Sequence, residues 1–127
     1  MSSTVADIAA QLFTNIEAGR VGAVAALYHD DVEVWHNFDN AVQTKQENLR
    51  VLEGLTQIAR KLRYEVLERH TVGDRFIQRH NLHCTTASGA EVMIPACVFI
   101  TVEDGKIRRI DEYLDTAQTK ALRGSQT

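Results

Sequence analysis

The stretch from Glu91 to Asp115, EVMIPACVFITVEDGKIRRIDEYLD, holds the residues best suited to chemistry. Asp104-Gly105 separates two β-rich runs, and Asp-Gly in that setting is a strong hairpin signal. The first arm is apolar on both faces, which predicts a strand in the middle of a sheet. The second arm becomes polar, and a carboxylate such as Glu112 beside a buried strand requires a partner or a task. Glu112 is therefore the first candidate functional residue.

Strand register suggests partners for Glu112. Counting outward from a Ser-Gly turn at 88–89 places His80 opposite Cys97, and counting from the Asp-Gly turn places Cys97 opposite Glu112. These three side chains are then expected on one face of the sheet, among apolar neighbours. Apolar surroundings favour the neutral form of a carboxyl group, and a nearby histidine can exchange a proton with it. The pattern therefore predicts an acid/base pair of Glu112 and His80.

Two alternatives to this pair stay open. A β-bulge would shift the count by one residue and bring Arg79, Asn81 or Asp111 to the same face. Glu112 and His80 could also form a buried ion pair that joins two strands and has no catalytic role.

Three amphipathic helices are predicted in the first half of the chain. The first has Thr4 and Asp7 as a capping box and ends at Gly19. Its apolar stripe comprises Val5, Ile8, Ala9, Leu12, Phe13 and Ile16. A second helix, at 21–28, follows at once and forms a hairpin with the first. A third begins at the capping box of Thr44 and Glu47 and extends to about residue 61.

Strands make up the rest of the predicted fold. A short strand at 32–37 lies between the second and third helices, and from residue 63 the apolar period changes to two. Strands at 63–72 and 75–86, separated by a Gly-Asp turn, precede the hairpin. The order α-α-β-α-β-β-β-β predicts an α+β fold, in which a strongly curved, mostly antiparallel sheet wraps around three helices as a cone. We expect a single domain over residues 1–127, with 1–3 and 123–127 frayed.

Composition argues against several classes of partner. The chain has 127 residues, 44% of them hydrophobic, which suffices for one core. A net charge of -3 and a pI near 5.9 argue against nucleic acid or an anionic membrane as partner. No apolar run approaches the roughly 20 residues that span a bilayer, and the N-terminus lacks the features of a signal peptide. Because Cys84 and Cys97 form no disulfide framework, a reducing, cytoplasmic setting is expected.

Several motifs resemble the nuclear-transport-factor-2-like superfamily, in particular its SnoaL-like branch. They are EAGR at 17–20, ALYHDDVEVWHN at 26–37, and EDGKI followed by DEYLD between residues 103 and 115. The resemblance covers nearly the whole chain and implies the cone fold. The superfamily includes ketosteroid isomerases, limonene epoxide hydrolases, polyketide cyclases, dehydratases and proteins without a catalytic role, so the fold does not decide the function.

The epoxide-hydrolase branch is the most similar residue by residue. Its Tyr-x-Asn resembles Trp-His-Asn at 35–37, and its catalytic aspartate corresponds to Glu112, which precedes Tyr-Leu-Asp. Its Arg-x-Asp corresponds to Arg-His-Asn at 79–81, where Asn81 replaces the acid. The isomerase branch is less similar, because its helix tyrosine aligns near Leu12 and its first-strand aspartate near His36.

The resemblance implies that the first strand neighbours the last, which would bring His36 and Asn37 to the pocket. We predict an enzyme that acts on a small apolar organic molecule by proton transfer or water addition. Glu112 would be the base, with His80 or His36 as its partner, and an asparagine at position 37 would position water or an oxyanion. The predicted ligand-contacting residues are Trp35, Tyr28, Cys97, Phe99, Ile110 and Leu114. The alternative is a non-catalytic module for ligand binding or dimerisation.

A homodimer that uses neither metal nor cofactor completes the prediction. The late strands carry apolar residues on both faces, but three helices can cover only one of them, so a monomer would expose the other. His80 and His83 lie three residues apart in a predicted strand and point to opposite faces, which is a poor spacing for a metal site.

Overall fold

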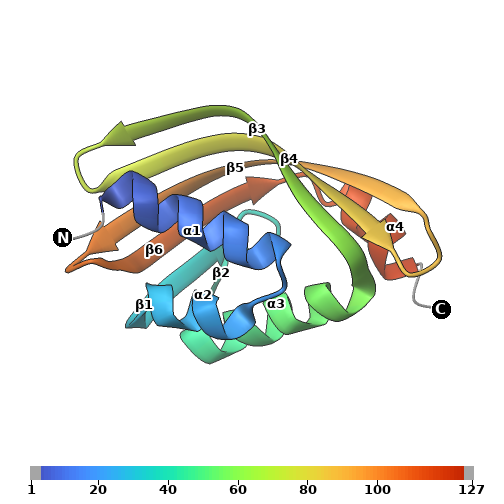
Figure 1. Ribbon diagram of the computed structural model, residues 1–127, viewed down its shortest axis with the longest axis horizontal. Coiled ribbons are helices and arrows are strands. Elements are labelled where there is room, and N and C mark those ends of the chain that lie inside the picture. The colour runs from blue at the N-terminus through green and yellow to red at the C-terminus, as the bar shows by residue number, and fades with distance from the viewer. Residues whose placement is uncertain (1–3, 125–127) are drawn as a thin grey trace.

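Four helices and a six-stranded sheet make up residues 4–124, the part of the chain that the computed structural model describes (Figure 1). The elements in chain order are α1 (Val5–Glu17), α2 (Val21–Leu27), β1 (Tyr28–His36), β2 (Ala41–Gln43), α3 (Lys45–Ile58), β3 (Ala59–Val72), β4 (Arg75–Thr86), β5 (Glu91–Glu103), β6 (Lys106–Leu114) and α4 (Ala117–Gly124). The predicted α+β arrangement of a curved sheet around helices is confirmed.

The strands form one sheet in the order β2-β1-β6-β5-β4-β3. Neighbouring strands are antiparallel except β1 and β6, which run parallel. The first strand therefore lies beside the last, as the resemblance implied. Figure 1 shows the long strands bending around α1, which contacts β3, β4, β5 and β6. The curvature leaves a concave side for the helices and an outer side that they do not cover.

Capping residues explain where the first and third helices begin. Thr4 accepts from the Asp7 N–H and Asp7 accepts from the Thr4 N–H, and Thr44 and Glu47 repeat this pattern at α3. Gly19, at φ 72°, terminates α1 in a conformation that glycine adopts without strain. Both predicted capping boxes are thus confirmed, and α1 buries the predicted apolar stripe against the sheet except for Val5, which is partly buried.

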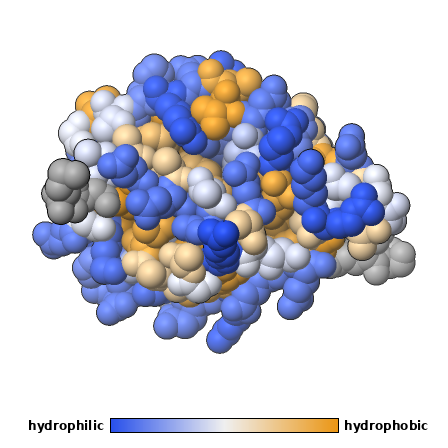
Figure 2. All heavy atoms as spheres, in the orientation of Figure 1, coloured by the Kyte–Doolittle hydropathy of each residue, from blue (hydrophilic) through white to orange (hydrophobic). Residues whose placement is uncertain are grey.

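One hydrophobic core lies between the helices and the concave side of the sheet. Ala9, Val24, Ile100 and Ile107 are each 0% exposed within it. On the face shown in Figure 2 the surface is mainly hydrophilic, with apolar side chains in scattered patches. Polar side chains inside the core are therefore exceptions that need a physical explanation.

Two short elements were not predicted. β2 has 3 residues and pairs with β1, and α4 packs against β5. Neither is long enough to show a clear apolar period. The end of α3 at Ile58 also comes earlier than predicted, because β3 begins at Ala59 and pairs there with β4. Of the expected frayed ends, 1–3 and 125–127 lie outside the described residues, whereas 123 and 124 belong to α4.

A tight turn and a β-bulge determine the last hairpin. Asp104 and Gly105 have φ angles of 54° and 76°, the left-handed pair that a two-residue type I′ turn requires. Beyond the turn the pairing shifts at Thr101, which leaves Arg108 as an extra residue on β6. The turn is confirmed, but every pairing beyond the bulge is displaced by one residue.

The hairpin of β4 and β5 is displaced as well. Its turn runs from residue 86 to residue 90 rather than through two residues only, so His80 pairs with Ala96. The bulge in the last hairpin makes Glu112 pair with Val98. The predicted pairings of Cys97 with His80 and with Glu112 are therefore both wrong.

The two register shifts cancel for His80 and Glu112. Side chains alternate between the two faces of a strand, and the partners Ala96 and Val98 lie two residues apart on β5. His80 and Glu112 therefore share the concave face, as predicted. Cys97 lies between those partners and faces the outside of the sheet.

Candidate functional site

A cavity of about 310 Å³ lies between the concave face of the sheet and helices α1 and α3. Apolar and aromatic side chains form most of its wall, among them Phe13, Leu52, Leu55, Ile94, Val98 and Ile110. Thr119 brings α4 into the lining. Small-molecule sites span ~300–1,000 Å³, so this cavity suits a ligand at the small end of that range.

Glu112 and His36 meet at the cavity wall. They are register partners on β6 and β1, and Nε2 of His36 lies 3.0 Å from Oε1 of Glu112. The His36 side chain is 10% exposed and the Glu112 side chain 26%. The Nδ1 atom of His36 is buried and has no hydrogen-bond partner among the described residues. A hydrogen on Nδ1 would lack an acceptor among these residues, whereas one on Nε2 would lie near the carboxylate.

His80 is the second histidine of the cavity. Its ring packs edge-on against Phe13 and Tyr64, with centroid distances of 5.6 and 4.9 Å. Its Nδ1 lies 2.9 Å from Nε2 of Gln78. Burial lowers the pKa of His80, although the negative charge of Glu112 acts in the opposite direction. The lowered pKa favours the neutral form of His80.

Two tyrosines contribute hydroxyl groups to the same cavity. The Tyr28 hydroxyl donates to Oδ1 of Asn48 at 2.7 Å, and Asn48 donates in turn to Oε1 of Gln43 at 3.0 Å. Burial, and after it the charge of Glu112, raises the pKa of Tyr28 and of Tyr64. Both hydroxyl groups therefore keep their protons at neutral pH. The proton of Tyr28 is already donated to Asn48, whereas Tyr64 can donate to a ligand.

The cavity thus combines one carboxylate with several neutral donors. The charge of Glu112 acts on the pKa of His80, Tyr28 and Tyr64, which places all three within its electrostatic reach. A ligand in the cavity would meet one proton acceptor and several hydrogen-bond donors. Because the surroundings are apolar, these interactions are stronger than the same contacts would be in water.

Most of the predicted site residues lie in this cavity. The lining includes Glu112, His80, His36, Tyr28, Ile110 and Leu114. Glu112 contacts His36 rather than His80, so its direct partner comes from the neighbouring parallel strand.

Asn37 and Trp35 lie outside the cavity. Because His36 faces inward, strand alternation turns both of its neighbours away. Oδ1 of Asn37 accepts a hydrogen bond from the Leu114 N–H at 2.9 Å, which ties the end of β1 to the end of β6. The indole Nε1 of Trp35 donates to Oδ1 of Asn40 at 2.8 Å. The expected roles of Asn37 in positioning water and of Trp35 as a pocket wall are therefore corrected to roles in the sheet.

Cys97 and Phe99 also lie on the outer side, as a consequence of the register shifts. Cys97 pairs with Tyr113, and the Tyr113 ring packs edge-on against Phe99 and Trp35, with centroid distances of 6.3 and 5.1 Å. These contacts form an outer aromatic cluster of Trp35, Phe99 and Tyr113. The expectation that Cys97 and Phe99 contact a ligand in the cavity is thus corrected.

The residues that a bulge was expected to bring inward also face outward. Arg79 and Asn81 bond to glutamates of β3, at 2.8 and 3.2 Å. Asp111 accepts from Arg109 at 2.9 Å. The Arg-His-Asn segment that resembles the epoxide hydrolases therefore contributes only its central His80 to the cavity.

Reasoning from the sequence missed Tyr64, Asn48 and Gln78. Tyr64 stands two residues after the buried Leu62 on β3, and Gln78 stands two residues before His80 on β4. The strand period of two would have placed both on the concave face. Asn48 gives no such signal, because a single polar residue in the first turn of a helix is usually solvated.

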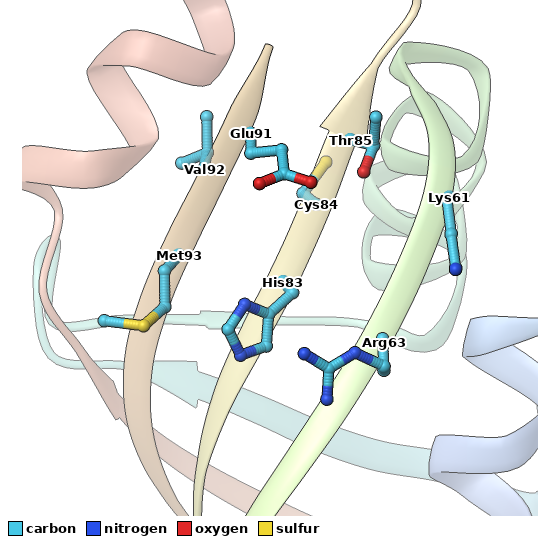
Figure 3. A pocket seen from close by; sticks show the side chains of 8 residues that line it. All are labelled: Lys61, Arg63, His83, Cys84, Thr85, Glu91, Val92 and Met93. Atoms are coloured by element: carbon cyan, nitrogen blue, oxygen red, sulfur yellow. The ribbon is translucent and has the colours of Figure 1, made fainter. Parts of the chain in front are cut away.

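A second hollow, of about 470 Å³, lies at another place on the sheet (Figure 3). Arg63, His83 and Met93 stand at directly paired positions of β3, β4 and β5, so their side chains project to the same side. Nε2 of His83 lies 2.8 Å from Oε1 of Glu65. Exposed ion pairs of this kind contribute little to stability, and the hollow shows no convergence of buried polar groups comparable to that around Glu112.

Two further findings concern metal and membrane. Within residues 4–124, no three His, Cys, Asp or Glu side chains gather as a metal ion would require. No helix in that range combines the length and apolar character needed to cross a bilayer. Cys84 and Cys97 are free thiols.

Solved structures with the same fold cover nearly the whole chain. A protein from Shewanella putrefaciens described as a SnoaL-like polyketide cyclase has a TM-score of 0.81 and 12% identity, over 98% of this chain and 99% of that chain. A protein with a ketosteroid isomerase-like fold from Catenulispora acidiphila, in complex with trimethylamine, has a TM-score of 0.79 and 11% identity, over 95% of each chain. TerC, co-crystallised with polyporic acid, has a TM-score of 0.78 and 17% identity, over 94% of this chain and 98% of that chain. Identities this low establish the fold alone.

Family membership rests on the sequence match rather than on these structures. No curated protein matches the chain. The model of the SnoaL-like domain matches residues 9–110, from α1 to the middle of β6. This range contains most of the cavity wall, including His36, His80 and both tyrosines. The chain therefore belongs to the family of SnoaL-like domains.

Proposed function

We propose that the cavity binds a small, mainly apolar organic molecule and that Glu112 acts on it as a general base. The observation that carries this proposal is the contact of Glu112 with His36, 3.0 Å from Oε1 to Nε2, at the wall of a mainly apolar cavity. Placing a carboxylate there costs free energy, and such placements concentrate at functional sites.

The proposed reaction is a proton transfer that uses side chains of this chain. Glu112, in contact with Nε2 of His36, accepts a proton from a carbon next to a carbonyl group. The electron pair of that C–H bond moves into the C–C bond, and the carbonyl oxygen gains negative charge. Neutral donors such as Tyr64 and His80 stabilise that charge. Glu112 then returns the proton to another carbon of the ligand, which gives an isomerisation. In a cyclase-like reaction the enolate carbon instead attacks a second carbonyl carbon of the same ligand, and the oxygen of that carbonyl receives the proton. If Glu112 takes its proton from water, the oxygen of that water adds to an electrophilic carbon, which is hydrolysis.

A non-catalytic ligand-binding module is the second candidate. The Tyr28 hydroxyl already donates a hydrogen bond to Asn48 at 2.7 Å, and Glu112 already has His36 as a contact partner. Groups that are paired within the protein can serve the core without acting on a ligand. Small molecules occupy two of the structurally similar proteins, trimethylamine in one and polyporic acid in the other. Ligand binding is therefore common to both candidate functions, and proton transfer separates them.

Proton exchange at carbon tests the proposal without knowledge of the natural substrate. Small cyclic ketones such as cyclohexanone are incubated with the protein in deuterated buffer, and loss of the α-protons is followed by NMR. We expect the wild type to accelerate exchange and Glu112→Gln to abolish the acceleration. Asp111→Asn is the matched control, because it removes the same charge from the next residue, on the outer face. Equal exchange by wild type and Glu112→Gln, or binding without exchange, would overturn the catalytic proposal.

A further inference from the structure

Gln78 is fully buried and connects the cavity to the surface. It is 0% exposed and lies two residues from His80 on the same face of β4. Its Oε1 accepts from Nε of Arg69 at 2.6 Å, and its Nε2 lies 2.9 Å from Nδ1 of His80. Arg69 is the register partner of Gln78 on β3. A chain of hydrogen bonds thus runs from an exposed arginine through a buried amide to a cavity histidine.

Arg69 determines which way the amide of Gln78 points. A guanidinium group only donates hydrogen bonds, so the amide atom that faces it must be the oxygen. The amide nitrogen then faces His80, and its N–H can only donate. Nδ1 of His80 must therefore accept and carries no proton. Arg69 is itself held in place over the ring of Phe76, 5.8 Å from the centroid.

We infer that Arg69 and Gln78 are positioning residues that hold His80 as the neutral tautomer with its proton on Nε2. Edge-on packing against Phe13 and Tyr64 prevents the ring from turning to another partner. Among the described residues Nε2 has no hydrogen-bond partner, so its N–H remains available to a ligand in the cavity.

This tautomer makes His80 a donor and not a base. A second proton would have to sit on Nδ1, where it would face the N–H of Gln78, so the cationic form loses its hydrogen bond as well as its solvation. Under the proposed function, on which this assignment rests, the two side chains have different roles. Glu112 accepts protons, and His80 donates a hydrogen bond to an oxygen of the ligand. The ligand class is then a small apolar molecule that carries an acceptor oxygen, such as a cyclic ketone or its enolate.

Nitrogen NMR of the ligand-free protein tests the tautomer directly. The protein is labelled with nitrogen-15 in histidine, and His80→Gln identifies the resonances of His80. We expect the wild type to carry the proton on Nε2 and Gln78→Glu to move it to Nδ1, because a carboxylate accepts where the amide donated. A proton on Nδ1 of the wild type, or a tautomer that is unchanged in Gln78→Glu, would overturn the inference.

Variants of Arg69 keep the test usable if Gln78→Glu fails to fold. Arg69 is exposed, so Arg69→Met should fold, and it frees the amide to rotate. We expect a mixture of His80 tautomers in Arg69→Met and restoration of the Nε2–H form in Arg69→Lys, which keeps a donor. A single Nε2–H tautomer in Arg69→Met would contradict the role of the arginine.

Ligand preference separates this inference from the proposed function. Cyclohexanone and methylcyclohexane serve as probes of similar size with and without the oxygen. We expect the wild type to bind cyclohexanone about tenfold more tightly than methylcyclohexane, because one additional hydrogen bond contributes roughly that factor to the affinity. Gln78→Glu should lose this preference. A preference that persists in Gln78→Glu would overturn the inference. If the tautomer is as inferred but neither probe binds, the proposed function fails and the positioning role of Gln78 stands.

Discussion

At the scale of single residues, the cavity keeps a carboxylate where a stable core would have none. Among the described residues the Glu112 side chain has one close polar contact, with Nε2 of His36, which stands at the same wall and itself has an unpaired Nδ1. Neighbouring pairs such as Tyr28 and Asn48 are better satisfied. A partly desolvated carboxylate with so little compensation weakens a fold, and natural proteins tolerate this mainly where activity requires it.

His80 should make the stability of the protein depend on pH. Its pKa is lower in the folded protein than its ordinary value of 6.5, so as the pH falls the unfolded chain binds the proton first. The free energy of unfolding should therefore decrease as the pH falls below about 6.5, until the lowered pKa is passed. His80→Gln should remove this part of the dependence. Urea denaturation of both proteins across about pH 7.5 to 5 measures it, and identical losses in the two would contradict the assignment.

Acidic side chains on the outer face affect the stability of the protein at lower pH than His80 does. Hydrogen bonds from His83 and Asn81 lower the pKa of Glu65, and those from His70 and Arg79 lower the pKa of Glu68. The stability that these groups contribute is lost only as the pH falls below the ordinary carboxylate value of about 4.5. The histidine effect can therefore be observed separately.

At the scale of elements, local signals made the helices and turns predictable. The capping boxes at Thr4 and Thr44, the apolar stripe of α1 and the Asp-Gly turn each depend on residues close together in the chain. Strand register depends instead on how one strand meets another. The extra residue Arg108 and the wide turn at 86–90 leave no clear mark in the sequence, so the predicted partners of Cys97 were wrong.

The candidate site was predictable only in part for the same reason. His80 and Glu112 were placed together because two errors of one residue cancelled. The pairing of His36 with Glu112 depends on the parallel contact between β1 and β6, which the resemblance implied and the periodicity did not. The position of Tyr64 on the concave face could have been predicted from strand alternation, but it was not recognised. Asn48 depends on the packing of α3 against β1, which no local pattern shows.

Helix α3 forms one wall of the cavity, and its cap should affect stability. Thr44→Ala removes the side chain that accepts from the Glu47 N–H, and loss of such a cap costs about 1 kcal/mol. Thr14→Ala is the matched control at an exposed position inside α1, where alanine should be neutral or slightly stabilising. Urea denaturation compares the two. Equal stability of Thr44→Ala and wild type would show that packing alone holds the start of α3.

At the scale of the whole molecule, the outer face of the sheet is the surface that the helices leave uncovered. It carries the outer aromatic cluster of Trp35, Phe99 and Tyr113, and charged pairs such as Arg79 with Glu68 lie on the same side. Tyr113 is 49% exposed and Met93 45%. An apolar centre with charged surroundings is the composition of many protein–protein interfaces.

The homodimer expected from the sequence stays a prediction, and we expect this outer face to join the two copies of the chain. Tyr113→Arg would place a charge in the centre of the expected interface and should shift the protein to monomer. Gln11→Arg, at an exposed position of α1 on the opposite side of the sheet, should leave the association unchanged. Sedimentation equilibrium measures both. A wild type that is monomeric at micromolar concentration would contradict the dimer.

The stability of Glu112→Gln tests the central claim, that this carboxylate is placed for chemistry rather than for the fold. The amide oxygen of glutamine can keep the contact with Nε2 of His36, and the charge that is costly to bury disappears. We therefore expect Glu112→Gln to be at least as stable as the wild type in urea denaturation at pH 7, with Asp111→Asn as the outward-facing control. If His36 were a cation paired with Glu112, the substitution would leave a buried charge uncompensated. A loss of roughly 3 kcal/mol or more would show this and would contradict the account.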